Sequence, residues 1–101
     1  MQFNLATSDE IAQEFGHRLR AHRLAENLQQ SELAARAGVS ERALRNFERS
    51  GQGSFDLFLR VVIALGLIDS MSSLFGVRPR SIKDMEQSSK RRQRASRRAA
   101  E

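Results

Sequence analysis

The chain of 101 residues contains no cysteine, no tryptophan, no tyrosine and only one proline, Pro79. Without cysteine it can form no disulfide framework, no thiolate metal site and no cysteine nucleophile. The position of Pro79 leaves the preceding residues free of the strongest helix breaker. Six phenylalanines are the only aromatic residues, so the core is expected to be mainly aliphatic. These absences favour an all-α protein.

Long apolar segments are also missing. The longest mainly apolar stretch, residues 55–68, contains Asp56 and Arg60 and is too short to span a bilayer. Residues 1–10 lack the basic and apolar regions of a signal peptide. We therefore expect no membrane association and a cytoplasmic location, in a bacterial cell and at the nucleoid when the protein is bound to DNA.

The formal charge of +5 is confined to one end of the chain. Residues 1–87 hold 11 Arg or Lys and 11 Asp or Glu, whereas residues 88–101 hold six basic residues and one acid. This terminal segment has no apolar periodicity, so we expect a disordered basic tail. The tail has four interpretations: non-specific phosphate contacts, insertion into a minor groove, docking on an acidic partner, or a solubilising end.

Capping residues and glycines divide the preceding chain into five predicted helices. Thr7 and Glu10 form a capping box that begins a helix running to about Asn27, although Gly16 weakens its pattern. Further helices are expected at residues 30–37, 41–50, 54–65 and about 69–75, with glycine after each. Residues 1–7 are read as an extended arm, with a short strand as the alternative. The predicted organisation is arm 1–7, domain 8–76, connecting segment 77–87 and tail 88–101.

The two short helices at 30–37 and 41–50, joined by a turn on Gly38, form a helix-turn-helix pattern. Ala34 is small enough for the helices to cross closely, and Leu33, Val39, Leu44 and Phe47 are expected in the shared core. The outer face of the second helix is then free to enter a DNA major groove. An arginine there can donate two hydrogen bonds to O6 and N7 of guanine, and a glutamate can accept one from the N4 amino group of cytosine. The candidate base readers are Glu41, Arg42 and Arg45, and the candidate phosphate contacts around the following loop are Arg49, Ser50, Gln52 and Ser54.

This pattern resembles the Cro/repressor (XRE) family of DNA-binding domains over roughly residues 15–75. The resemblance is carried by Arg-x-x-Arg at 20–23, Gln-x-x-Leu-Ala at 30–34, Gly-Val-Ser at 38–40 and Asn-Phe-Glu at 46–48. It implies a five-helix lambda-repressor-like DNA-binding domain. By resemblance, Gln30, Ser40 and Asn46 contact the DNA backbone, Glu41, Arg42 and Arg45 read bases, and Arg23 and Glu48 form a structural salt bridge. The competing interpretation is a solvated helix face with an i,i+4 pair between Glu41 and Arg45.

The predicted helix at 54–65 is apolar on nearly every side. One side closes the core of the monomer, and the remaining apolar side chains must be covered by another surface. We therefore predict a symmetric homodimer, with completion of the monomer core as the alternative. Two recognition helices about 34 Å apart require an inverted-repeat operator in double-stranded DNA, as suits an autorepressor. The candidate interface residues are Leu59, Ile63, Met71 and Phe75.

Two other functions compete with the autorepressor. A weaker resemblance to HipB-like antitoxins rests on the N-terminal extension, the segments 64–67 and 73–75 and the basic tail, and implies a kinase-like toxin as partner. A non-specific nucleic-acid binder led by the tail is the third possibility. No catalytic set is recognisable, so neither an enzyme nor a cofactor is expected. No metal is expected either, because His17 and His22 lie five residues apart on different helix faces.

Overall fold

The computed structural model describes residues 1–76, which form four α-helices and two short 3₁₀ helices and contain no strand. The α-helices are α1 (Ser8–Ala25), α2 (Gln30–Ala37), α3 (Glu41–Ser50) and α4 (Phe55–Ala64). The 3₁₀ helices are η1 (Phe3–Leu5) and η2 (Ile68–Met71). The all-α class is confirmed for these residues. The predicted connecting segment 77–87 and basic tail 88–101 lie outside the described residues.

Side-chain caps begin three of the α-helices at the predicted positions. The Thr7 hydroxyl accepts from the Glu10 N–H at 3.2 Å, and the Glu10 carboxylate accepts from the Thr7 N–H at 3.3 Å. Ser40 begins α3 and Ser54 begins α4, each accepting from an amide of the first turn at 3.0 Å. Such caps satisfy amides that the first turn leaves without an intrahelical acceptor. The starts of these helices are therefore fixed by local sequence.

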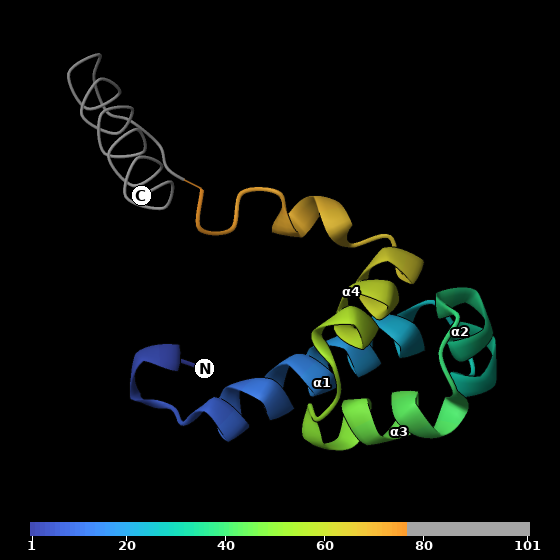
Figure 1. Cartoon of the computed structure of the whole chain (residues 1–101), viewed down its shortest axis with the longest axis horizontal. Helices are drawn as coiled ribbons and strands as arrows, with labels where there is room; N and C mark the ends of the chain where they lie inside the picture. Colours follow the sequence, from blue (N-terminus) through green and yellow to red (C-terminus); the bar gives the residue numbers. More distant parts are fainter. Residues whose placement is uncertain (77–101) are drawn as a thin grey trace, which may run out of the picture.

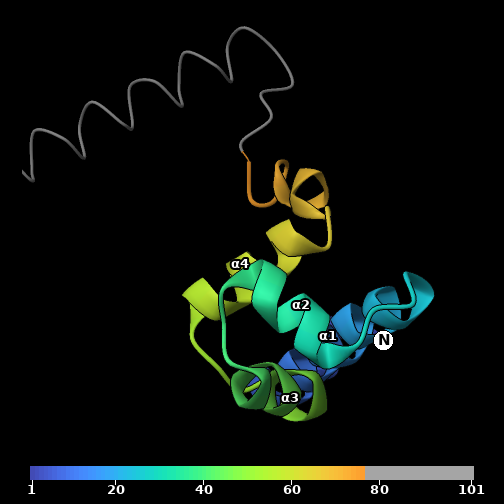
Figure 2. The same ribbon diagram turned by 90° about the vertical axis from the view of Figure 1, so that its right-hand side faces the viewer.

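The core lies between the four α-helices. In this arrangement α1 packs on α3, and α2 packs on both α3 and α4 (Figures 1 and 2). The predicted core residues Leu33, Ala34, Leu44 and Phe47 are buried, and Val39 is half-buried against them. None of the helices in residues 1–76 is long and apolar enough to cross a membrane. The remaining buried apolar side chains are Leu19, Leu28, Ala37, Val61, Val62 and Leu65.

The N-terminal residues fold onto α1 and do not form the alternative strand. The Phe3 ring in η1 lies 5.5 Å from the Phe15 ring of α1, which lies 5.9 Å from Phe58 of α4. The guanidinium of Arg18 sits 5.2 Å from the centre of the Phe3 ring. Aromatic and cation–π contacts of this kind hold a short turn against a helix. The arm is therefore a turn packed on α1.

The predicted fifth helix is replaced by η2 and a series of turns through Phe75. The Ser72 hydroxyl donates to the Asp69 carbonyl at 2.8 Å, and the Ser72 amide bonds the same carbonyl at 3.3 Å. Serine side chains compete in this way with the backbone ladder of an α-helix. Phe75 has a φ of 56°, which no right-handed helix accepts. The prediction of five α-helices was therefore wrong at this point.

Gly16 does not interrupt α1, because the helix needs it for close packing against α3. A methyl group added at Gly16 would overlap the backbone carbonyl oxygen of Phe47. A second close approach occurs at the end of α3, where Gly51 has a φ of 74° and an added methyl would overlap the Ala12 carbonyl. Both glycines let α1 and α3 approach backbone to backbone. The weakness that Gly16 gives to the helical pattern is therefore overridden by packing.

Replacing Gly16 by alanine is expected to lower the free energy of unfolding by about 2 kcal/mol, because the added methyl forces α1 and α3 apart. Urea denaturation followed by circular dichroism measures this loss. Gly53→Ala is the matched control, since the nearest atom to its added methyl is a Leu57 side-chain carbon at 3.4 Å. A Gly16→Ala protein as stable as the parent would contradict the close packing.

Candidate nucleic-acid interface

The α2 and α3 helices are joined by a tight turn built on Gly38, which has a left-handed φ of 69°. The Val39 amide donates to the Ala34 carbonyl at 3.0 Å and closes the end of α2. Ser40 then begins α3 within two residues of Gly38. Ala34 is buried at the crossing, where a larger side chain would separate the helices. Local backbone and packing together therefore build the helix-turn-helix pattern.

The outer face of α3 presents three arginines. Arg42, Arg45 and Arg49 are exposed and stand at i, i+3 and i+7, so they share one side of the helix. Leu44 and Phe47 occupy the buried side. In both views α3 runs along the lower edge of the molecule, with α1 and α2 above it (Figures 1 and 2). The arginine side of α3 is thus free to approach a partner.

Glu41, the third predicted base reader, lies at the first position of α3 and is also exposed. Its carboxylate is 3.6 Å from Arg45 Nη2, an i,i+4 pair in which both side chains are about half exposed. An ion pair of this length in water is weak. Both side chains can therefore change partner at little cost when another polar surface approaches.

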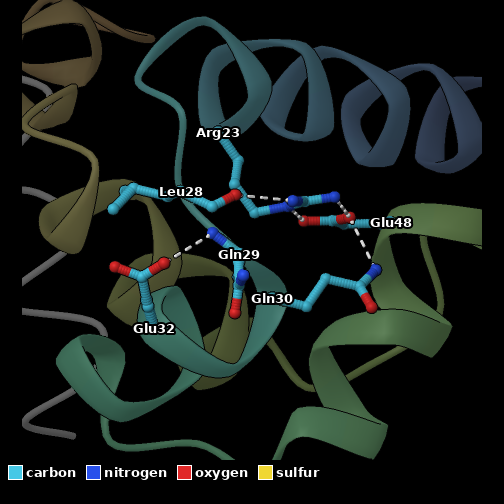
Figure 3. A network of polar contacts seen from close by, with 6 residues as sticks. All are labelled: Arg23, Leu28, Gln29, Gln30, Glu32 and Glu48. Carbon is cyan, nitrogen blue, oxygen red and sulfur yellow. Dashed lines mark hydrogen bonds and ion pairs between the residues drawn. The ribbon is translucent and has the colours of Figure 1, made fainter.

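A buried polar network fixes α3 relative to α1 and α2 (Figure 3). The Glu48 carboxylate accepts from Arg23 Nε at 2.8 Å and from Arg23 Nη2 at 3.0 Å, a bidentate pair between α3 and α1. Arg23 Nη1 also donates to the Leu28 carbonyl at 2.8 Å. The amide of Gln30, at the start of α2, donates to Glu48 Oε1 at 3.1 Å. One carboxylate thus joins three elements that carry the predicted site.

The serines among the predicted backbone contacts already have roles within the domain. The hydroxyls of Ser40 and Ser54 cap α3 and α4, and the Ser50 hydroxyl donates to the Asn46 carbonyl at 2.8 Å. The half-buried Asn46 also accepts from Arg49 Nη2 at 3.5 Å, while Gln52 is exposed in the loop. The structure therefore gives Ser40, Ser50 and Ser54 helix-end roles in this chain.

A polar hollow of about 280 Å³ opens beside α3, and we call it the α1–α3 hollow. It brings Gln30 together with Arg45 and Arg49, three of the residues that the sequence predicted for the site. Sequence reasoning assigned no DNA contact to His17 and Arg20, which also line this hollow. The sequence could have indicated Arg20, because it stands three residues before Arg23 and therefore lies near the side of α1 that meets α3. Its lining residues are His17, Arg20, Gln30, Arg45, Glu48 and Arg49.

The four predicted dimer residues fall into two separate hollows. Met71 and Phe75 line a groove of about 610 Å³, here called the apolar groove, together with Phe15, Phe55, Phe58 and Leu74. Leu59 and Ile63 line a second space of about 440 Å³, the α2–α4 hollow, whose rim carries Arg36 and Arg60. Ser54, a predicted phosphate contact, also lines the apolar groove. The sequence had grouped all four residues in one interface, formed by the predicted helix at 54–65 and the apolar edge of the predicted helix at about 69–75.

A helix-turn-helix family model matches residues 19–69, half of the chain. The matched region begins in the middle of α1 and ends in η2, so it includes the turn at Gly38, the arginine side of α3 and the Arg23–Glu48 pair. No curated protein matches the chain at a significant level.

Proposed function

The chain belongs to the Cro/repressor (XRE) family of helix-turn-helix DNA-binding proteins, and from this premise we propose that it recognises a specific inverted-repeat operator as a homodimer. Transcriptional regulation is the role of this family. The finer proposal is that the protein represses its own promoter by occluding polymerase. The observation that carries the recognition of DNA is the arginine side of α3, which the Arg23–Glu48–Gln30 network holds in place.

The chemistry of α3 supports base reading in the major groove. Arg42 and Arg45 each offer a planar fork of donors that matches the O6 and N7 acceptors of guanine. Glu41, at the helix start, can accept from the cytosine amino group once its weak pair with Arg45 separates. Arg49 and Gln52 lie at or beyond the end of this face, where phosphate contacts fix register without reading sequence.

The homodimer is supported by the exposed aromatic and apolar side chains of the apolar groove. Phe75 is 96% exposed and its φ of 56° is disfavoured for a bulky residue. A strained backbone that holds a large ring in water costs stability in a monomer, and burial against a second copy offsets that cost. Two copies joined there would present two α3 helices to half-sites about 34 Å apart.

Fluorescence anisotropy on DNA from just upstream of the gene tests the proposal. Binding that remains tight at two salt concentrations and exceeds binding to a scrambled duplex is the expected result. Equal and salt-sensitive binding to both duplexes would overturn sequence recognition, and would instead favour the non-specific binder led by residues 88–101. Deleting that segment would then abolish the affinity.

Replacing Arg45 by alanine is expected to reduce discrimination between operator and scrambled duplex by about 1–3 kcal/mol, because one bidentate base contact is lost. Competition anisotropy measures the discrimination, and circular dichroism checks that the fold is retained. Arg36→Ala is the matched control, since this exposed arginine of α2 lines the α2–α4 hollow. Unchanged sequence preference in Arg45→Ala would remove Arg45 from the base readers.

The antitoxin alternative is favoured by one feature, the α2–α4 hollow. Ile63 is 59% exposed there, and Leu59 lines the same hollow. If the apolar groove holds a second copy, this hollow remains for a different protein. Co-purification with a kinase-like protein encoded next to the gene, lost on Ile63→Glu, would support the alternative. Retention of that complex by Ile63→Glu would exclude this surface.

A further inference from the structure

We infer that the N-terminal turn, residues 1–6 around η1, is a second part of the homodimer interface and packs against Leu74 and Phe75 of the other copy. The inference rests on the homodimer of the proposed function. It extends the interface beyond the apolar groove, and it commits the exposed apolar side chains of the turn to one occupant, a second copy of this chain.

The apolar groove is too small to be the whole of a stable interface. Eleven residues line it, whereas a stable interface usually takes about 20–30 residues from each copy. A homodimer that uses the groove must therefore also cover surface next to it. The direction of that extension is indicated by the apolar side chains that the domain itself leaves exposed.

The turn carries two such side chains. Leu5 is 85% exposed and Met1 is 63% exposed, while Phe3 between them is half-buried. Exposed apolar side chains that lie together mark surfaces that bind another protein, because burial removes them from water. The turn is therefore suited to face a second copy.

The turn and the groove are connected by aromatic rings. The Phe3 ring lies 5.5 Å from the Phe15 ring, and Phe15 lies 5.9 Å from Phe58. Both Phe15 and Phe58 line the groove. In Figure 1 the dark-blue turn lies below the orange segment that ends at residue 76, on the side of the domain away from α2. The turn thus continues the apolar surface of the groove.

The cation beside the turn already has a counter-charge. Arg18 lies over the Phe3 and Phe15 rings, 5.2 and 5.9 Å from their centres. Its Nε donates to the Glu14 carboxylate at 3.1 Å. A second copy that covers the rings therefore buries no unpaired charge, and the ion pair can stand at the polar rim that protein interfaces have.

Two-fold symmetry pairs the turn with the segment around Phe75. In a symmetric dimer each contact occurs twice, with the roles of the two copies exchanged. When the axis runs along the groove, the α1 side of the groove in one copy faces the side formed by Leu74 and Phe75 in the other. The exposed ring of Phe75 is then covered by Leu5 of the other copy.

Leu5→Glu tests the inference through the strength of the dimer. Burial of one leucine favours association, so the variant should raise the dimer dissociation constant about tenfold or more, as measured by sedimentation velocity over a range of concentrations. Leu24→Glu is the matched control. Leu24 is 47% exposed near the other end of α1, so the same charge there should leave the dissociation constant unchanged. Circular dichroism checks that both variants fold.

Disulfide cross-linking tests the pairing itself, because the chain contains no cysteine of its own. The single variants Leu5→Cys and Leu74→Cys, one of them carrying a size tag, are mixed and oxidised. A cross-linked dimer of mixed size on a non-reducing gel is the expected result, since a disulfide forms only between residues whose Cα atoms come within about 7 Å. Leu24→Cys mixed with Leu74→Cys is the control and should give no such product.

A dimer as tight in Leu5→Glu as in the parent, without the mixed cross-link, would overturn the inference while the homodimer stands. A weaker dimer without the cross-link would keep the turn in the interface and overturn its pairing with residues 74–75. A parent protein that sediments as a monomer at every concentration would overturn the homodimer of the proposed function, and the inference with it.

Discussion

Replacing Glu48 by alanine is expected to destabilise the domain by about 3–5 kcal/mol, because it leaves the Arg23 guanidinium buried without a counter-charge. Arg23 is only 6% exposed, and its Nε and Nη2 groups would lose their acceptor together with the Gln30 amide. This loss is a large share of the roughly 5–15 kcal/mol that stabilises a small domain. Urea denaturation followed by circular dichroism measures it.

Two further variants test whether the loss of stability comes from the buried Arg23–Glu48 pair and not from removing any carboxylate of α3. Glu41→Ala removes a carboxylate from the same helix, but its pair with Arg45 is long and exposed, so the expected cost is under about 1 kcal/mol. The double variant Arg23→Met, Glu48→Met should be more stable than Glu48→Ala, since no uncompensated charge remains. If Glu48→Ala cost no more than Glu41→Ala, the network would not be what holds α3.

Replacing Phe75 by glutamate is expected to convert the proposed homodimer to a monomer and to weaken operator binding by about a hundredfold or more. A charge in the apolar groove would be desolvated by the second copy, which is strongly unfavourable. The affinity falls because two linked half-site contacts gain roughly 10²–10⁴ over one. Sedimentation velocity measures the oligomeric state, and anisotropy on the operator measures the affinity.

Ile63→Glu is the matched control for this experiment. It places the same charge on an exposed apolar position of the α2–α4 hollow, so it should leave the dimer intact. The reverse result, a monomer with Ile63→Glu and a dimer with Phe75→Glu, would move the interface to the α2–α4 hollow. A dimer in both variants would remove both surfaces from the interface.

Much of the fold was predictable because its signals are local. Thr7, Ser40 and Ser54 begin helices through hydrogen bonds that span three residues. Gly38 and Gly51 end helices through a left-handed backbone that only short-range sterics decide. The wrong prediction of an α-helix after residue 68 also has a local cause. The Ser72 hydroxyl and the Ser72 amide both donate to the Asp69 carbonyl. Apolar periodicity alone did not register that competition.

The arginine side of α3 was also predictable, because i, i+3 and i+7 spacing puts Arg42, Arg45 and Arg49 on one face of any α-helix. The contribution of α1 to the same surface was not. Arg20 and Arg49 are separated by 29 positions in the sequence, and they line one hollow only because Gly16 lets α1 pack closely on α3.

The sequence by itself therefore determined the helix starts, the turn at Gly38, the residues on the exposed face of α3 and the family to which the chain belongs. The tertiary structure alone decided that His17 and Arg20 stand beside the recognition helix, and that the four candidate dimer residues divide between two hollows. The physical reason is the sequence distance over which each kind of interaction acts. Caps, turns and helical periodicity act over a few residues, whereas a shared surface depends on how closely distant backbones can approach, which packing sets.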